Sequence, residues 1–140
     1  MYHCFRLTRG QDLYAQIDSY VKDHHIAAGV VLSAVGCVYR WRLRDATGVR
    51  VRSGDEEAEI VSLMGTVSES GCHLHASFAR EDMSVFGGHL LTGCLVNTTA
   101  EIVISSLEDV TFSREPDEHT GYDELAIKFK GKETSHEWIE

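Results

Sequence analysis

The sequence predicts an α/β protein of the α+β type, a single domain with a central, largely antiparallel β-sheet and few helices. Three observations lead to this prediction. The chain has 140 residues, which is the size of one domain. Only one segment has apolar residues at clear helical spacing. About seven segments have the alternating or β-branched pattern of strands, and turn residues rather than helices separate most of them.

The helix and the first strands are predicted in the first half of the chain. Residues 2–7 form a short, mixed segment that suits an edge strand. Residues 11–24 have a helical stripe made of Leu13, Ile17, Tyr20 and Val21. Residues 30–35 indicate a buried strand that Gly36 closes. Residues 38–53 alternate on both sides of the turn segment 45–48, which predicts a β-hairpin.

The second half is predicted to contain strands and one polar loop. Residues 59–68 and 72–78 form a strand pair around a turn at Gly71, and residues 90–96 and 100–107 are further apolar stretches. Residues 113–122 form a polar loop with the single proline, Pro116, before a final strand over 125–129. The domain is expected to span residues 2–130, and residues 131–140 to form a polar tail. One helix covers only part of a sheet face, so the uncovered apolar face predicts a partner subunit.

Charge and cysteine content restrict the function classes. Thirteen basic and 22 acidic residues give a net charge of −9, which disfavours DNA binding unless basic residues are concentrated locally. The four cysteines have no C-x-x-C spacing, which excludes a zinc ribbon or thioredoxin-like motif and favours reduced thiols. No apolar run reaches the length of a membrane span and the N-terminus lacks signal-peptide character, so we expect a cytoplasmic protein that contacts no membrane.

The most specific local pattern is a histidine pair in residues 72–78. Side chains two apart on a strand project from one face, so His73 and His75 lie side by side while Cys72 points the other way. His89 follows the glycine pair 87–88, where a bend would bring its ring close. Together the three imidazoles could hold Zn²⁺ or another divalent transition metal, with one coordination position left open. The alternative is that they are ordinary strand histidines bonded to carbonyl groups or water.

The predicted hairpin is rich in arginine. Each of its two strands has an alternating arginine row, and the five members are Arg40, Arg42, Arg44, Arg50 and Arg52. If both rows share one face, they form a positive stripe that would contact DNA phosphates. The alternative is a solvated face on which the arginines pair with nearby acids, the candidates being Asp45, Asp55, Glu56 and Glu57.

Four segments together resemble a known family. They are residues 65–68 (G-T-V-S), 73–78 (H-L-H-A-S-F), 87–94 (G-G-H-L-L-T-G-C) and 99–104 (T-A-E-I-V-I). In this order they resemble the "plants and prokaryotes conserved" (PPC) domain, also called DUF296, in its free-standing prokaryotic form, over residues 2–129. The resemblance implies a homotrimer with an antiparallel sheet, and a metal site near a subunit boundary whose ligands would be His73, His75 and His89. Prokaryotic members are commonly described as DNA-binding proteins. The AT-hook that accompanies the plant domain is missing here, and residues 56–61 keep only the Glu-Ile of the plant G-R-F-E-I-L motif.

Three classes of function follow from these patterns. The first, and the one we favour, is a non-enzymatic trimeric module associated with DNA or a regulatory partner. The second is a metal-dependent enzyme acting on a small molecule, in which Glu101 would be a general base next to the three histidines. The third is a structural metal that holds subunits together. The sequence contains no P-loop and no G-x-S-x-G element, and it identifies no catalytic residue.

Overall fold

The computed structural model describes residues 1–131, which form one helix and nine strands. The elements, in chain order, are β1 (Tyr2–Thr8), α1 (Leu13–Asp23), β2 (Gly29–Arg44), β3 (Val51–Gly54), β4 (Ala58–Ser68), β5 (Gly71–Ala79), β6 (Val85–Leu90), β7 (Leu95–Ser106), β8 (Val110–Pro116) and β9 (Asp123–Phe129).

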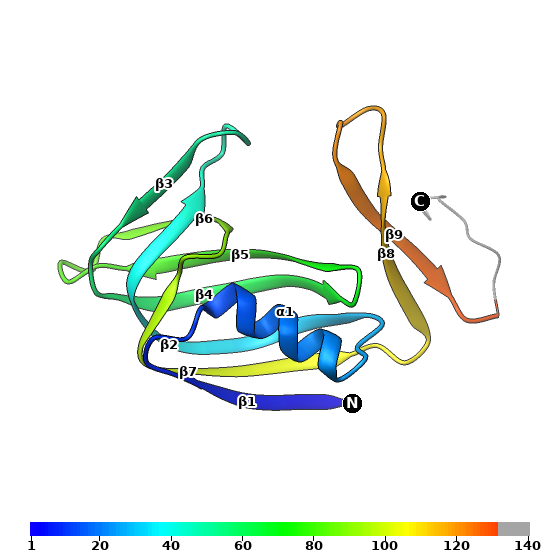
Figure 1. Cartoon of the computed structure of the whole chain (residues 1–140), viewed down its shortest axis with the longest axis horizontal. Helices are drawn as coiled ribbons and strands as arrows, with labels where there is room; N and C mark the ends of the chain where they lie inside the picture. The colour runs from blue at the N-terminus through cyan, green and yellow to red at the C-terminus, as the bar shows by residue number, and fades with distance from the viewer. Residues whose placement is uncertain (132–140) are drawn as a thin grey trace.

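Seven strands form one antiparallel sheet in the order β1-β7-β2-β4-β5-β6, with β3 beside β2 (Figure 1). The long strand β2 organises it. Its first part lies between β7 and β4, while its last residues pair with β3 and β6, Arg44 lying opposite His89. The sheet therefore curves until β6 meets the end of β2. The predicted single domain with a mostly antiparallel sheet and one helix is confirmed.

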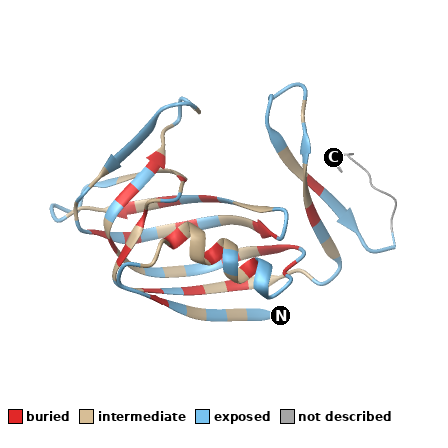
Figure 2. Cartoon of the chain, in the orientation of Figure 1, coloured by how far each residue is buried: buried red, intermediate tan, exposed pale blue. Residues whose placement is uncertain are grey.

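The helix α1 covers one face of the sheet, and its apolar side supplies much of the core (Figure 2). Leu13, Ile17 and Val21 are fully buried, as the helical spacing predicts. Asp12 is the N-cap, because its carboxylate accepts a hydrogen bond of 2.9 Å from the N–H of Ala15. Tyr20, which we expected on the same stripe, is only partly buried and packs at the edge of the core.

Gly36 does not close a strand, contrary to our expectation. It lies inside β2 with φ +151°, and a Cβ atom there would meet the backbone of Thr99 on β7. The glycine allows β2 and β7 to approach closely at an irregular point of their register, so the strand continues through it.

Two predicted segments in the second half are wrong. The apolar stretch 90–96 is not one strand, because β6 ends at Leu90 and β7 begins at Leu95, with Gly93 at φ +108° between them. The predicted loop 113–122 begins within β8, since backbone pairing with β9 outweighs the polar composition of that segment. The final strand is confirmed as β9. Residues 132–140 of the predicted tail lie outside the described residues.

The hairpin β8–β9 forms a separate two-stranded sheet that extends from one end of the main sheet (Figure 1). Three hydrogen bonds attach its base: the N–H of Phe112 donates to Ala27 O at 3.0 Å, Ser70 Oγ donates to Phe112 O at 3.4 Å, and Arg114 donates to Thr66 Oγ1 at 3.2 Å. The hairpin thus stands beside the strands that carry the histidines.

The sheet face opposite α1 keeps large apolar side chains in solvent. Leu32, Val35, Val61 and Met64 on β2 and β4 are each at least half exposed. Within residues 1–131, no helix is long and apolar enough to cross a membrane.

Candidate metal centre

The structure brings His73, His75 and His89 together on the sheet face opposite α1. On β5, Leu74 and Ala76 point into the core, so His73 and His75, which alternate with them, point outward. His75 lies directly opposite His89 on β6. The Nε2 atoms of His73 and His75 are 3.2 Å apart, and one nitrogen from each of the three rings lies within 4.8 Å of the others. Side chains from two strands, β5 and β6, therefore converge on one cluster.

Glycines allow the backbone to position these rings. Gly87 and Gly88 lie within β6 and do not form the bend that we expected. A Cβ atom at Gly87 would come within 2.5 Å of Ala76 O, and one at Gly88 within 2.6 Å of Arg44 O. The pair therefore serves close packing of β6 between β5 and the end of β2, which places His89 beside His75.

The environment keeps two of the imidazoles neutral. Burial, followed by the charge of Arg44 and the other two histidines, lowers the pKa of His89 to about 4. Burial and then His75 also lower the pKa of His73. A neutral imidazole has a free lone pair, and this is the form that binds a metal.

The three residues fit a divalent transition metal. Nitrogen donors from three histidines are a donor set typical of Zn²⁺ and its neighbours in the transition series. The Nδ1 atom of His89 is buried and has no hydrogen-bond partner within residues 1–131. A ligand for that atom, or a proton acceptor beside it, would remove the cost of leaving it unpaired.

Cys72 is not part of the cluster. It lies on β5 next to His73, but burial raises the pKa of its thiol to about 12, and Asp18 of α1 contributes. The thiol therefore stays protonated, in agreement with the alternation argument. All four cysteines are free.

Glu101 is far from the histidines in the sheet. It lies on β7 opposite Arg6 of β1, and both β2 and β4 separate β7 from β5. Arg80, directly after β5, donates from Nε to Glu56 Oε1 at 3.2 Å and forms no hydrogen bond or ion pair with Glu101 within residues 1–131. Within residues 1–131, the structure does not bring Glu101 to the cluster as a general base.

A cleft of about 350 Å³ adjoins the cluster, between the main sheet and the β8–β9 hairpin. His73 and His89 line it together with charged and aromatic side chains whose proximity to the histidines no sequence pattern predicts. Those residues are Arg44, Arg114, Tyr122, Asp123 and Glu124. No sequence spacing relates β5 to the hairpin, so no local signal could have found this wall.

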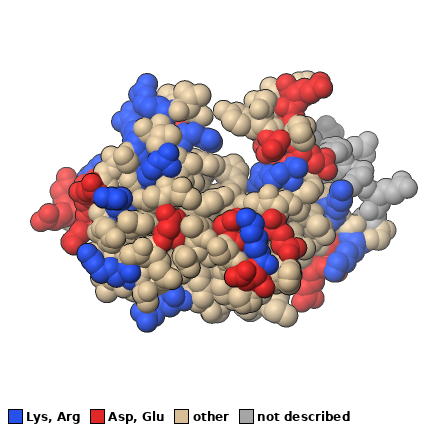
Figure 3. Space-filling view, in the orientation of Figure 1, with Lys and Arg blue, Asp and Glu red and all other residues tan. Residues whose placement is uncertain are grey.

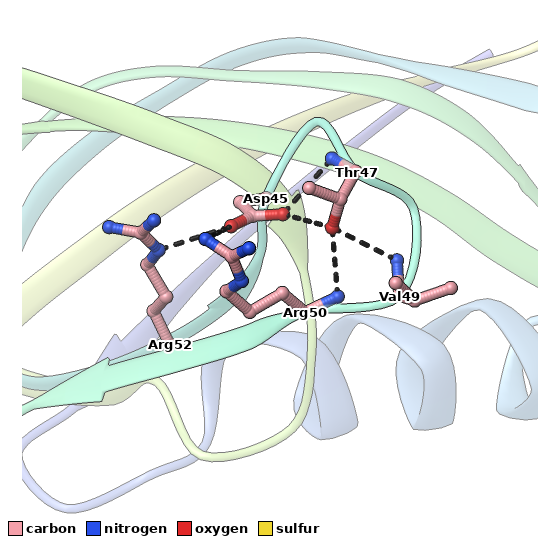
Figure 4. Close-up of polar contacts among 5 residues, drawn as sticks. All are labelled: Asp45, Thr47, Val49, Arg50 and Arg52. Carbon is pink, nitrogen blue, oxygen red and sulfur yellow. Dashed lines mark hydrogen bonds and ion pairs between the residues drawn. The ribbon is translucent and has the colours of Figure 1, made fainter.

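Most of the predicted arginine set is engaged within the chain. Arg40 Nε lies 2.5 Å from Asp55 Oδ1, and Arg42 donates to Thr92 O at 3.1 Å. Asp45 Oδ2 lies 3.1 Å from Arg52 Nε and 3.8 Å from Arg50 Nη1 (Figure 4). Four arginines thus have partners, and the acids include two that we named, Asp45 and Asp55.

The two arginine rows do not share one face. Directly opposite residues of an antiparallel pair point to the same side, and Arg52 lies opposite Leu43 whereas Arg42 lies opposite Ser53. Arg52 therefore projects from the face opposite to that of Arg42 and Arg44. Basic side chains still gather around the tip of the β2–β3 hairpin, at the upper left of Figure 3.

Comparison with known proteins gives one family match. A model described as the Plants and Prokaryotes Conserved (PCC) domain matches residues 1–108. The bifunctional protein GlmU of Synechococcus sp. strain JA-2-3B'a(2-13) is 43% identical over 125 residues, which are 88% of this chain, and GlmU of strain JA-3-3Ab is 42% identical over 123 residues. The chain spans about a fifth of the length of these curated relatives.

Solved structures share the fold. A hypothetical protein from Salmonella cholerae-suis is 34% identical, with a TM-score of 0.89 over 93% of this chain and 94% of that one. A metal-containing protein from Archaeoglobus fulgidus is 30% identical, with a TM-score of 0.71 over 88% and 91%. A "putative DNA binding protein" from Bacteroides thetaiotaomicron is 22% identical, with a TM-score of 0.79 over 89% and 90%, a likeness of fold alone.

Proposed function

Since this chain belongs to the Plants and Prokaryotes Conserved domain family, we propose that it is a metal-binding module in which His73, His75 and His89 hold a divalent transition metal, with zinc as the first candidate. The observation that carries this proposal is the convergence of three imidazole nitrogens within 4.8 Å. The metal content of the relative from Archaeoglobus fulgidus supports it. Such an ion, when bound by three protein ligands, keeps a coordination position for water or another ligand.

Metal analysis tests the proposal directly. We expect the natively purified protein to contain about one transition metal ion per chain, and chelator-treated protein to bind Zn²⁺ again in a calorimetric titration. His75→Ala removes one donor and is expected to weaken Zn²⁺ binding at least tenfold. His119→Ala removes an exposed histidine of the β8–β9 turn and is the matched control. Metal-free protein that binds no Zn²⁺ would contradict the proposal.

We also propose a homotrimer, with the metal site near a subunit boundary. The exposed apolar residues of β2 and β4 support a protein partner on that face, because solvent rarely contacts a large apolar patch of a monomer. The solution mass should be three times that of one chain. Met64→Lys places a charge on this face and is expected to dissociate the assembly, while Met83→Lys, in an exposed turn, should leave it intact. A monomeric wild-type protein would exclude the trimer.

Removal of the metal by a chelator distinguishes two roles of the ion: a structural ion that holds the subunits together, and an ion that is not needed for assembly. If the ion is structural, chelation dissociates the trimer. If the trimer resists chelation, the ion acts on a ligand or a substrate.

DNA is the proposed partner. The naming of the Bacteroides thetaiotaomicron neighbour supports it, and so does the basic hairpin tip, whose candidate contacts are Arg40, Arg42, Arg44, Arg50 and Arg52. Binding would require Arg40, Arg42, Arg50 and Arg52 to exchange their internal partners for phosphates. The affinity should therefore fall steeply as salt rises. Arg50→Gln should weaken binding in a mobility-shift titration, and Lys22→Gln on α1 should not. A duplex that is not retarded even at low salt would remove DNA from the proposal.

A metal-dependent enzyme acting on a small molecule is the second candidate. The cleft beside the histidines favours it, because a substrate could reach the open coordination position there.

The four free cysteines fit a reducing compartment, and we propose that the protein is located in the cytoplasm.

A further inference from the structure

Arg44 differs from the other arginines of its hairpin. It lies opposite His89 in the register, so its side chain is on the face that carries the histidines. Its Nε atom is buried and has no hydrogen-bond partner within the part of the chain that the structure describes. The guanidinium lies 5.9 Å from the centre of the Tyr122 ring, which packs against it from the β8–β9 hairpin. A buried, unpaired guanidinium donor is costly unless a ligand completes it.

Arg114 approaches the same cleft from the other side. It extends from β8 and donates to Thr66 Oγ1 at 3.2 Å, and Thr66 lies directly opposite His73. This hydrogen bond fixes one end of the guanidinium next to the cluster, and within residues 1–131 its other N–H groups have no partner and can bind a ligand. Arg114 and Arg44 both line the cleft of about 350 Å³.

The acids of the cleft do not neutralise these arginines directly. Asp123 and Glu124 also line it, yet among residues 1–131 neither lies within 4.0 Å of the guanidinium nitrogens of Arg44 or Arg114. Two guanidinium groups therefore face the cleft without an ion-pair partner among the residues that the structure describes. The acids sit at the hairpin side of the cleft and would repel a large polyanion there.

We propose that this cleft binds a small molecule through a carboxylate or phosphate group, with Arg44 and Arg114 as the anion-binding residues next to the three histidines. The planar guanidinium matches the paired oxygens of such groups, and charge-assisted hydrogen bonds of this kind are strong. The volume, at the lower end of the range for small-molecule sites, fits a compact metabolite.

The second wall of this site lies outside the family match. The model of the family covers residues 1–108, whereas Arg114 and Tyr122 belong to the β8–β9 hairpin that follows. The hairpin therefore determines which anion this particular chain accepts, while β5 and β6 provide the histidines.

Binding to chelator-treated protein tests the proposal without the metal. Inorganic phosphate and acetate are titrated separately and followed by NMR chemical shifts of backbone amides, and the tighter of the two identifies the anionic group. Arg44→Gln and Arg114→Gln should each weaken binding at least tenfold. Lys128→Gln removes an exposed charge from the same hairpin and should change the affinity less than twofold. Arg114→Lys, which keeps the charge but loses the fork, should fall between wild type and Arg114→Gln.

A second set of measurements distinguishes this proposal from the proposed metal function. The anion site rests on that function only for an additional contact from a bound ion. Anion binding that depends on both arginines, in a protein that binds no Zn²⁺, would overturn the metal site and support the cleft. Zn²⁺ binding with anion affinities that neither arginine variant changes would overturn the cleft alone. The cleft proposal would also be overturned if neither phosphate nor acetate, at millimolar concentration, bound to metal-free or Zn²⁺-loaded protein.

Discussion

Substitution of Gly65 tests how the sheet positions the histidines. Gly65 lies on β4 with φ +151°, opposite Leu74, which separates His73 from His75 on β5. A Cβ atom at this position would fall on the backbone carbonyl of His73, well inside the 3.0 Å that real Cβ atoms keep. Gly65→Ala therefore strains its own backbone and forces β4 and β5 apart at the histidine pair.

The expected loss in free energy of unfolding has two contributions, backbone strain and steric overlap, and a substitution at a second glycine distinguishes them. An alanine at such a φ costs about 1–3 kcal/mol, and the steric overlap adds about 1–3 kcal/mol. Gly71 at the start of β5 has φ +134° but nothing within 4 Å of an added Cβ. Gly71→Ala should therefore be destabilised only by the backbone strain, about 1–3 kcal/mol. Gly65→Ala should be destabilised by both contributions, about 2–6 kcal/mol in total.

Urea unfolding at one fixed protein concentration measures both variants, because the free energy of unfolding of an oligomer depends on concentration. Zn²⁺ affinity is measured in parallel. We expect Gly65→Ala to weaken Zn²⁺ binding, and Gly71→Ala to leave it close to wild type. Equal destabilisation by the two variants, or Gly65→Ala with unchanged Zn²⁺ affinity, would refute the reasoning.

Three further predictions concern pH, the helix cap and the hairpin turn. The pKa of His89 is about 4 in the folded chain against 6.5 unfolded, so the unfolded state binds the extra proton first and metal-free protein should lose stability as pH falls from 6.5 to 4. The shift corresponds to about 3 kcal/mol, which solvent at the cleft reduces to roughly 1–2 kcal/mol, and His89→Gln should flatten this part of the stability curve. Asp12→Ala removes acceptors for Ala15 N–H at 2.9 Å and Gly93 N–H at 2.6 Å and should cost about 1–3 kcal/mol in urea unfolding, whereas Asp23→Ala at the other helix end should cost nothing or stabilise slightly. Hydrogen bonds from Thr47 lower the pKa of Asp45, so Thr47→Val should raise that pKa in an NMR titration, and an unchanged value would contradict the assignment.

Much of the secondary structure was accessible to sequence reasoning because it depends on short-range periodicity. The helix stripe of Leu13, Ile17 and Val21 and the alternation around His73 and His75 each follow from the geometry of a single element. The errors occurred where backbone contacts between strands decided the outcome. Gly36 stays within β2 because β7 approaches it, and Gly87 and Gly88 stay within β6 because β5 and β2 do.

The sequence alone determined that an antiparallel α+β domain forms and which imidazoles share a strand face, because both depend on the alternation of neighbouring side chains. Only the tertiary structure decided that His89 pairs with His75, that the two arginine rows point in opposite directions, and that Arg44 faces the histidines across from Arg114. These relations depend on strand register and on the position of a hairpin distant in sequence. A shift of one residue in register reverses every side chain of a strand, and no local pattern records which register the assembled sheet adopts.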